Sequence, residues 1–166
     1  MAESLVVRRA LSDDLDAIRR IYNEGIEDRV ATLDTYPKSH DEIADWWADH
    51  DEKFVVVVAL EGDVVGWASL NRFSQRCAHS AIADLSVYVT RARRGRGIGT
   101  ALLVGLEAHA RAGGFRKIVL HALNANEHGK NLYRRSGYRE VGVFREHGII
   151  DGRFVDVVAM EKVLGT

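Results

Sequence analysis

The chain has 166 residues, 46% hydrophobic and 28% charged, with a formal net charge of −1. This composition predicts one globular domain over residues 1–166. The balanced charge excludes the basic field of nucleic-acid-binding or membrane-surface proteins. An apolar signal core is absent from the N-terminus and no apolar run approaches about 20 residues, so we expect a cytoplasmic protein.

Cysteine and histidine give no sign of metal or thiol chemistry. Cys77 is the only cysteine, which excludes an intrachain disulfide and fits a reducing compartment. The histidines form no HExxH motif, and no cysteine pair is present. We therefore expect no metal site.

The first part of the chain predicts a strand, a helix and a loop. A short strand is expected at residues 5–10. Ser12 can cap a helix over about residues 12–25, where apolar residues recur at helical spacing. Residues 25–39 contain Pro37, the only proline, and predict a loop that forms a lid or a wall over a substrate.

A second helix and a hairpin follow. Residues 40–50 predict a helix in which Trp46 and Trp47 are expected to pack rather than bind a ligand. Two apolar strands then flank a turn at residues 61–63. Residues 54–60 are apolar without alternation, which is typical of a strand covered on both faces.

The strand expected over residues 78–89 carries polar side chains at alternate positions. Alternation places Asp84, Ser86 and Tyr88 on one face and the apolar residues between them on the other. The remaining elements are a helix at 97–111, a strand at 115–123, a helix at 127–136 that Asn126 can cap, and a hairpin of 138–149 with 153–164. Together these elements predict a mixed α/β (α+β) domain with a central sheet flanked by helices.

The loop TRARRGRGIGTALL, residues 90–103, joins a strand to a helix. Glycines in this context expose backbone amides, and a helix N-terminus attracts anions, so phosphate is the expected ligand. Thr100 breaks the GxGxxG dinucleotide motif, and a P-loop would need a GK[ST] ending. The pattern R/Q-x-x-G-x-G/A is present as Arg94, Gly97 and Gly99.

This motif resembles that of the GNAT superfamily of acetyl-CoA-dependent N-acetyltransferases. The resemblance is greatest to the phosphinothricin acetyltransferase branch, including relatives that act on arsinothricin and methionine sulfoximine or sulfone. It rests on IYNEGIEDRVATLDT, ADLSVYVTRARRGRGIG and GVFREHGIIDGRFVDVVAMEKVL, and so extends over nearly the whole chain. It implies the GNAT fold, acetyl-CoA as co-substrate and a homodimer.

The resemblance also implies roles for individual residues. Tyr133 is the candidate acid that protonates the departing thiolate. Asp84, where relatives usually have Glu, is the candidate base, acting through water or after desolvation; alternatively it only orients the substrate. The pantetheine arm is expected on Val87, Tyr88 and Val89, with Asn126 opposite. The pyrophosphate is expected on the loop residues Arg94, Gly95, Arg96, Gly97, Ile98, Gly99 and Thr100.

The acceptor implied by the resemblance is the α-amino group of a small amino-acid-like substrate, to which the acetyl group passes directly in a ternary complex. At least one arginine should bind the substrate acid. The candidates for substrate contacts are Glu27, Arg29, Thr32, Arg72, Arg76 and His79. Two alternatives remain: an acetyltransferase for peptide or ribosomal-protein N-termini, and a non-catalytic acyl-CoA sensor, which would need neither Asp84 nor Tyr133.

Overall fold

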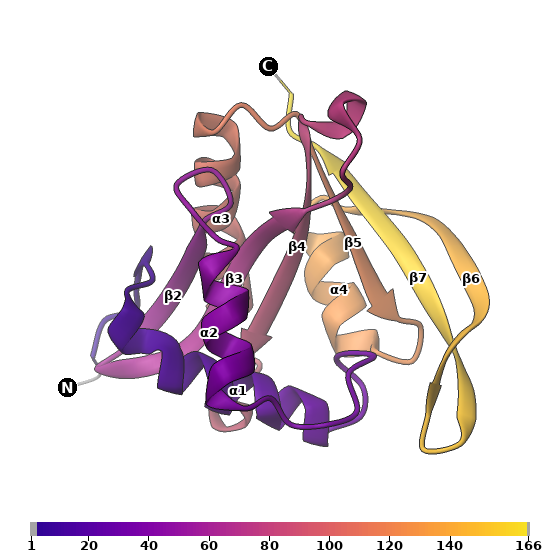
Figure 1. Ribbon diagram of the computed structural model, residues 1–166, viewed down its shortest axis with the longest axis horizontal. Helices are drawn as coiled ribbons and strands as arrows, with labels where there is room; N and C mark the ends of the chain where they lie inside the picture. The colour runs from indigo at the N-terminus through magenta and orange to yellow at the C-terminus, as the bar shows by residue number, and fades with distance from the viewer. Residues whose placement is uncertain (1–2, 166) are drawn as a thin grey trace.

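The computed structural model describes residues 3–165 and contains a seven-stranded mixed sheet flanked by helices (Figure 1). The strands occur in the order β1-β2-β3-β4-β5-β7-β6. They are β1 Val6–Arg9, β2 Val56–Glu61, β3 Asp63–Arg72, β4 Ile82–Val89, β5 Lys117–Leu123, β6 Arg139–Ile150 and β7 Arg153–Val163. The α-helices are α1 Leu15–Glu27, α2 His40–Ala48, α3 Ile98–Ala112 and α4 Glu127–Arg135. The predicted fold class is confirmed.

Apolar clusters cover both faces of the sheet. Val57 of β2 belongs to the larger cluster, which includes the buried face of α3. Its neighbours Val56 and Val58 belong to the cluster on the side of α1 and α2. Because successive side chains of a strand point to opposite faces, β2 is buried on both of them, as its continuous apolar run predicts.

The alternation predicted for β4 is confirmed. Leu85 and Val87 pack in the cluster on the α3 side. Tyr88 packs in the cluster on the α1 side and stacks on Trp67, with ring centroids 5.0 Å apart. The face that carries Asp84 and Ser86 is therefore turned toward α1 and α2.

The first helix begins differently from the prediction. Ser12 does not cap it; residues Ser12–Asp14 form a 3-10 turn, and the carboxylate of Asp14 accepts a hydrogen bond of 2.7 Å from the backbone N–H of Leu11. The helix also continues past Gly25. A Cβ at Gly25 would lie 3.0 Å from the Tyr88 ring, so this glycine permits close helix-to-strand packing and does not end the helix.

The start of β4 differs from the prediction, whereas the packing of the two tryptophans agrees with it. The strand β4 begins at Ile82 rather than at residue 78, because Cys77–His79 form a 3-10 turn. Trp46 and Trp47 both pack against the cluster on the α1 side, as predicted. Over residues 3–165, no helix has the length and apolar character needed to cross a membrane.

Candidate functional site

The strands β4 and β5 are paired over a short distance only. Their parallel ladder joins Ile82, Ala83 and Asp84 to β5, and the strands diverge beyond it (Figure 1). Among residues 3–165, no strand lies beside the β4 edge from Leu85 to Val89 on this side. A groove of about 680 Å³ opens there, lined by β4, the arginine and glycine loop, and α4. Unpaired strand edges offer backbone donors and acceptors to an extended ligand.

The loop leads into the N-terminus of α3. Gly95 and Gly97 have φ angles of 75° and 81°, and a Cβ at either position would meet nothing within 4 Å. Gly97 is the N-cap of α3 and makes no side-chain cap. The first amides of α3 therefore lack intrahelical acceptors, and they border the groove at Ile98, Gly99 and Thr100. This is an anion site of the helix N-terminal type, open to a ligand.

The arginines of the loop are not equivalent. Arg94 lines the groove, but its Nη1 lies 2.6 Å from the carboxylate of Asp28 and its Nε donates to the Val89 carbonyl. Arg96 is exposed and is not among the groove residues. Arg93 and, from α4, Arg135 do line it. The sequence analysis did not select these two. Arg135 lies at the end of α4, 40 residues after Gly95 of the loop, and no local pattern connects it to the loop.

In the fold, α4 lies against the start of α3. A Cβ at Gly99 would lie 2.8 Å from a methyl carbon of Leu132, so the two helices approach closely here. This contact brings Arg135 to the groove, and only the folded chain shows it.

The groove wall opposite β4 is built on α4. Asn126 caps this helix, as predicted: its Oδ1 accepts a hydrogen bond of 3.0 Å from the backbone N–H of Gly129. Both residues line the groove. Tyr133, one turn further along α4 from Gly129, lines it too, and burial raises the pKa of its phenol above the ordinary value. Tyr133 is therefore held in its protonated form.

A polar network on β3 surrounds Asp84. The side-chain amide of Asn71 donates to Asp84 Oδ2 at 3.2 Å and to Ser86 Oγ at 3.1 Å. On its other side, Asn71 Oδ1 accepts from Ser69 Oγ and lies 2.9 Å from His50 Nε2. Burial raises the pKa of the Asp84 carboxyl to about 6, although the hydrogen bond from Asn71 opposes this shift. A carboxyl group with this pKa can accept a proton near neutral pH.

His121 on β5 faces the same carboxyl across the opening. Its Nδ1 lies 4.0 Å from Asp84 Oδ1, and both residues line the groove. Burial, together with the nearby His147, lowers the pKa of His121. The sequence analysis missed His121, because only the pairing of β4 with β5 brings it beside Asp84.

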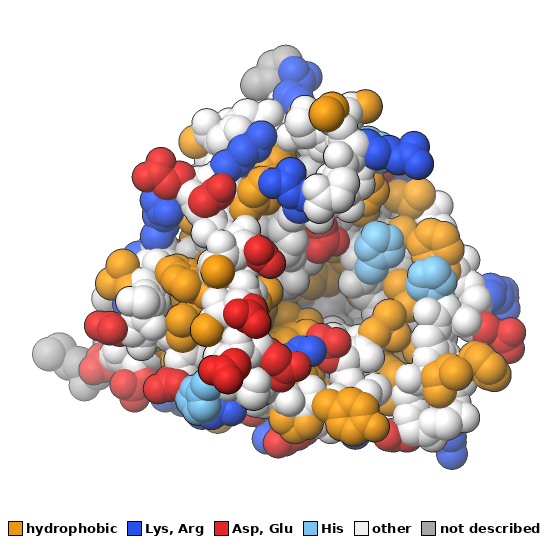
Figure 2. Space-filling model, in the orientation of Figure 1, with side chains coloured by type: hydrophobic (Ala, Val, Ile, Leu, Met, Phe, Trp, Pro, Cys, Tyr) orange, Lys and Arg blue, Asp and Glu red, His pale blue; other side chains and the backbone are white. Residues whose placement is uncertain are grey.

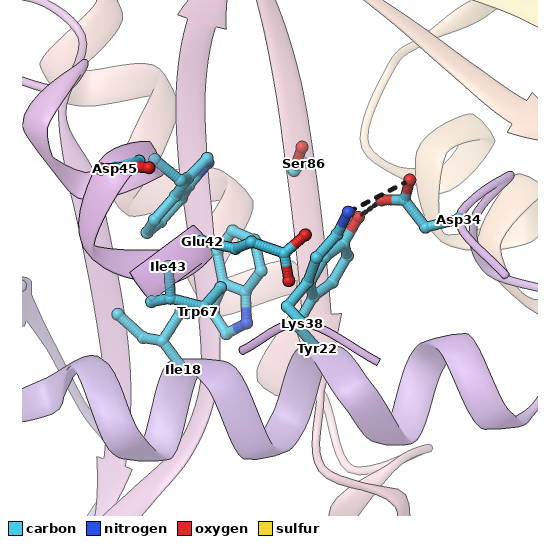
Figure 3. A pocket seen from close by; sticks show the side chains of 10 residues that line it. Ile18, Tyr22, Asp34, Lys38, Glu42, Ile43, Asp45, Trp67 and Ser86 are labelled. Carbon is cyan, nitrogen blue, oxygen red and sulfur yellow. Dashed lines mark hydrogen bonds and ion pairs between the residues drawn. The ribbon is translucent and has the colours of Figure 1, made fainter. Parts of the chain in front are cut away.

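A second cavity of about 380 Å³ lies on the α1 and α2 side of β4 (Figure 3). Ser86 lines both this cavity and the groove, so the two spaces meet at β4. Figure 2 shows a hollow on this face of the molecule, with Asp and Glu side chains along the side of α2 and His side chains on the side of β5 and β7. The second cavity is lined by Ile18, Tyr22, Asp34, Lys38, Glu42, Ile43, Asp45, Trp46, Trp67 and Ser86.

The residues expected to contact the substrate do not line either of these two spaces. Arg29 donates to the Thr35 carbonyl and pairs with Asp151 at 3.3 Å. The guanidinium of Arg72 lies over the Phe54 ring, 4.8 Å from its centroid. Glu27 pairs with Arg91, Arg76 donates its backbone N–H to Ser74, and His79 Nδ1 lies 2.7 Å from Ser74 Oγ. Thr32 Oγ1 accepts from the Asp34 backbone N–H and lies beside the phenols of Tyr22 and Tyr88, which line the cavity and the groove.

Potential metal ligands do not cluster in the part of the chain that the structure describes. Residues 3–165 contain no group of three or more His, Cys, Asp or Glu side chains arranged to hold an ion. Cys77 is a free, exposed thiol.

Comparisons with known proteins agree with this geometry. The model of the Acetyltransferase (GNAT) family matches residues 15–138. The L-methionine sulfoximine/L-methionine sulfone acetyltransferase of Pseudomonas paraeruginosa is 29% identical over 161 residues, which cover 95% of this chain and 94% of that protein. Both the family model and this relative include β4, the loop and α4.

Two solved structures superpose closely on the chain. The phosphinothricin acetyltransferase of Sinorhizobium meliloti, solved in complex with AcCoA, has a TM-score of 0.91 and 32% identity, covering 97% of this chain and 89% of that one. The ribosomal-protein-alanine N-acetyltransferase of Brucella melitensis also has a TM-score of 0.91, with 31% identity over 95% of this chain and 99% of that one.

Proposed function

Because the chain belongs to the Acetyltransferase (GNAT) family, we propose that it transfers an acetyl group from acetyl-CoA directly to the α-amino group of a small amino-acid-like substrate. The observation that carries this proposal is the groove between β4 and β5, with free amides at one end and Asp84 at the other. Phosphinothricin, arsinothricin, and methionine sulfoximine and its sulfone belong to this acceptor class.

The groove has the features that acetyl-CoA requires. The open space at Gly95 and Gly97 and the free amides that follow suit a pyrophosphate. Arg135 adds positive charge, whereas the charges of Arg93 and Arg94 are balanced by Glu61 and Asp28. The unpaired backbone of Val87, Tyr88 and Val89 would bind the pantetheine arm, with Asn126 on the other wall.

The side chains at the far end of the groove suit direct transfer. Asp84, near pKa 6, takes one proton from the substrate ammonium, either directly or through water, and the neutral amine then attacks the thioester. As the new N–C bond forms and the C–S bond breaks, Tyr133 donates its proton to the departing thiolate. The proton that the nitrogen loses in becoming an amide restores the phenol of Tyr133. A covalent enzyme intermediate is not needed, because the two substrates lie together in one continuous space.

The loop between α1 and α2 supports a small acceptor rather than an extended peptide. A Cβ at Gly148 of β6 would lie 2.6 Å from a methyl carbon of Leu33, so the loop and the hairpin of β6 and β7 touch. Arg29 and Asp151 add an ion pair between the same segments. This contact narrows the path that a protein N-terminus would have to follow.

A thiol-release assay with acetyl-CoA tests the function. The acceptors are the four amino-acid analogues, ordinary amino acids and a short peptide with a free N-terminus. We expect saturable release with an amino acid and little with the peptide. Faster release with the peptide would favour the protein N-terminus instead. No release with any amine, despite calorimetric binding of acetyl-CoA, would favour a non-catalytic acyl-CoA sensor.

We also propose a homodimer. The strand β6 lies at the edge of the sheet, and in the described part of the chain β7 is its only neighbour. It exposes several large apolar side chains, and Phe154 on β7 adds another. Long apolar edges are rarely left uncovered in stable proteins. The exposed apolar residues of β6 are Val141, Val143, Phe144 and Ile149.

A further inference from the structure

The cavity on the α1 and α2 side of β4 has walls of aromatic rings. The rings of Trp46 and Trp67 are 5.2 Å apart at an interplanar angle of 66°, and those of Tyr22 and Trp67 are 5.8 Å apart at 75°. These rings pack edge to face in the apolar cluster on the α1 side, and Tyr22, Trp46 and Trp67 also line the cavity. Aromatic faces attract organic cations. The indole N–H of Trp67, which is 3% exposed, has no hydrogen-bond acceptor among residues 3–165. This wall therefore retains a polar group that the chain does not satisfy.

The charged side chains of the cavity are mostly acidic. Lys38 is the only cation among the lining residues, and its Nζ lies 3.6 Å from Asp34, which also accepts from the Tyr22 hydroxyl. The Glu42 carboxylate has no basic partner within 4 Å in the described chain. It accepts a hydrogen bond from the backbone N–H of Ser39, and the backbone N–H of Glu42 donates to Ser39 Oγ in the same capping box. Figure 3 shows the Glu42 carboxylate between Trp67 and Tyr22. Asp45 adds a further carboxylate to the lining.

The arginines that could bind an anionic substrate side chain lie outside the cavity. Arg29 and Arg72 are held by Asp151 and by the Phe54 ring, and neither lines the cavity. A second anion on the substrate would therefore be placed against carboxylates and would be repelled. A second cation would be attracted by these carboxylates and by the aromatic faces.

We propose that this cavity is the side-chain subsite of the acceptor and that it selects a small amino acid whose side chain ends in a positive charge, such as lysine or ornithine. The inference rests on the proposed acetyl transfer and specifies its substrate. The α-amino group would lie by Asp84 and the side-chain ammonium between Glu42 and the rings. The cavity reaches β4 at Ser86, which is two positions from Asp84 on the same face and roughly 7 Å from it along the strand. An extended basic side chain covers this distance.

The experiment compares acceptors that differ only in the distal group. Lysine and norleucine have the same chain length, but norleucine lacks the ammonium; phosphinothricin carries an anionic group instead. With acetyl-CoA saturating, we expect kcat/KM for lysine to exceed that for norleucine by about tenfold, the value of one charge-assisted contact. Mass spectrometry of fragmented product should place the acetyl group on the α-nitrogen.

The variant Glu42→Gln removes the charge and retains an oxygen for the capping box. It should reduce the preference for lysine over norleucine by about fivefold. Asp41→Asn is the matched control, because Asp41 is the neighbouring carboxylate of the same helix turn, is exposed and does not line the cavity. It should leave the preference unchanged.

The results separate this inference from the proposed function. Equal or better turnover of norleucine or phosphinothricin, or acetylation of the lysine side chain, would overturn the inference while acetyl transfer stands. If no amine is acetylated, calorimetry of lysine binding in the presence of CoA determines whether the subsite exists. Binding that Glu42→Gln weakens and Asp41→Asn does not would support the subsite, and no binding would overturn it.

Discussion

The carboxyl group of Asp84 lies between a polar network on β3 and a histidine on β5. Asn71 donates to it at 3.2 Å, and His121 Nδ1 lies 4.0 Å away. Burial is the larger influence and raises the pKa of Asp84 from 3.8 to about 6. The residue therefore changes charge in the range where a general base is useful, even though its arm is one methylene shorter than that of Glu.

Replacing Asp84 by Asn tests this role through the pH dependence of activity. The carboxylate form is required, so kcat/KM of the wild type should rise with pH through about 6. Asp84→Asn should lose this limb and lower kcat by about 100-fold. An unchanged kcat would leave Asp84 as a residue that only orients the substrate.

The same substitution has an effect on stability with a definite sign. Below the unfolded pKa of about 3.8 the carboxyl is protonated in both states, and folding carries no cost of charge burial. As the pH rises through about 6, the folded chain must bury the charge, and stability is lost. Relative to Asp84→Asn, the wild type should lose on the order of 2–3 kcal/mol between pH 3.5 and pH 8. Denaturant unfolding at these two pH values measures it, and a constant difference would contradict the raised pKa.

Removing the hydroxyl of Tyr133 should slow the acetyl-transfer step without weakening the binding of CoA. Tyr133→Phe keeps the ring, which packs against Tyr138 with centroids 5.9 Å apart, and removes the acid. We expect kcat to fall by about 100-fold and the dissociation constant of CoA to change little. Steady-state kinetics measures kcat, and calorimetry measures the dissociation constant of CoA. The control is Tyr138→Phe, which loses a hydrogen bond to Glu107 but no group in the groove; equal kcat values for the two variants would reduce Tyr133 to a packing residue.

At the scale of elements, the N-terminus of α3 is the feature on which CoA binding depends. Gly97 has a φ of 81° and open space around it. An alanine there would be strained, and its methyl group would occupy part of the open space at the anion site beside the N-terminus of α3. Gly97→Ala should cost about 1 kcal/mol of stability. It should also weaken CoA binding by about tenfold or more, since amides can no longer approach the phosphates closely.

Gly114 provides a matched control for this prediction. It follows the other end of α3 with a φ of 83°, also has open space, and lies outside the groove. Gly114→Ala should cause the same loss of stability with no loss of CoA affinity. Calorimetry and thermal unfolding of both variants separate strain from binding. Equal CoA affinities would place the pyrophosphate elsewhere.

What the sequence predicted about these elements depends on the range of the interactions involved. The cap at Asn126 and the alternation along β4 arise from neighbouring residues, so local patterns revealed them. His121 and Arg135 reach the groove only because β5 and α4 pack beside β4 and α3. No local pattern carries this information.

The substrate side shows the same limit more strongly. The cavity joins residues from two helices, a loop and two strands, and Trp46, correctly expected to pack, also forms its wall. The arginines expected there are held by partners that only the folded chain reveals, such as Asp151 for Arg29. The sequence shows that a residue is cationic, but it does not show which residue or ligand the side chain contacts in the folded chain.

For the molecule as a whole, the uncovered edge of the sheet predicts association. The strand β6 pairs with β7 alone and leaves its other edge free, and its exposed apolar side chains would be in water in a monomer. A second copy that covers the same strand would bury them and create a symmetric contact. We therefore expect light scattering to give about twice the chain mass of 18.5 kDa.

Two variants determine whether this edge is the interface. Val143 on β6 is 44% exposed. In a symmetric dimer, Val143→Lys would place one charged side chain from each copy in the contact, so the dimer should dissociate at micromolar concentration. Val104→Lys is the control, because Val104 is 65% exposed on α3, on another part of the surface. A wild-type chain that scatters as a monomer would exclude the dimer. A dimer that survives Val143→Lys but not Val104→Lys would move the interface to α3, because a charge disrupts only the apolar contact into which it is introduced.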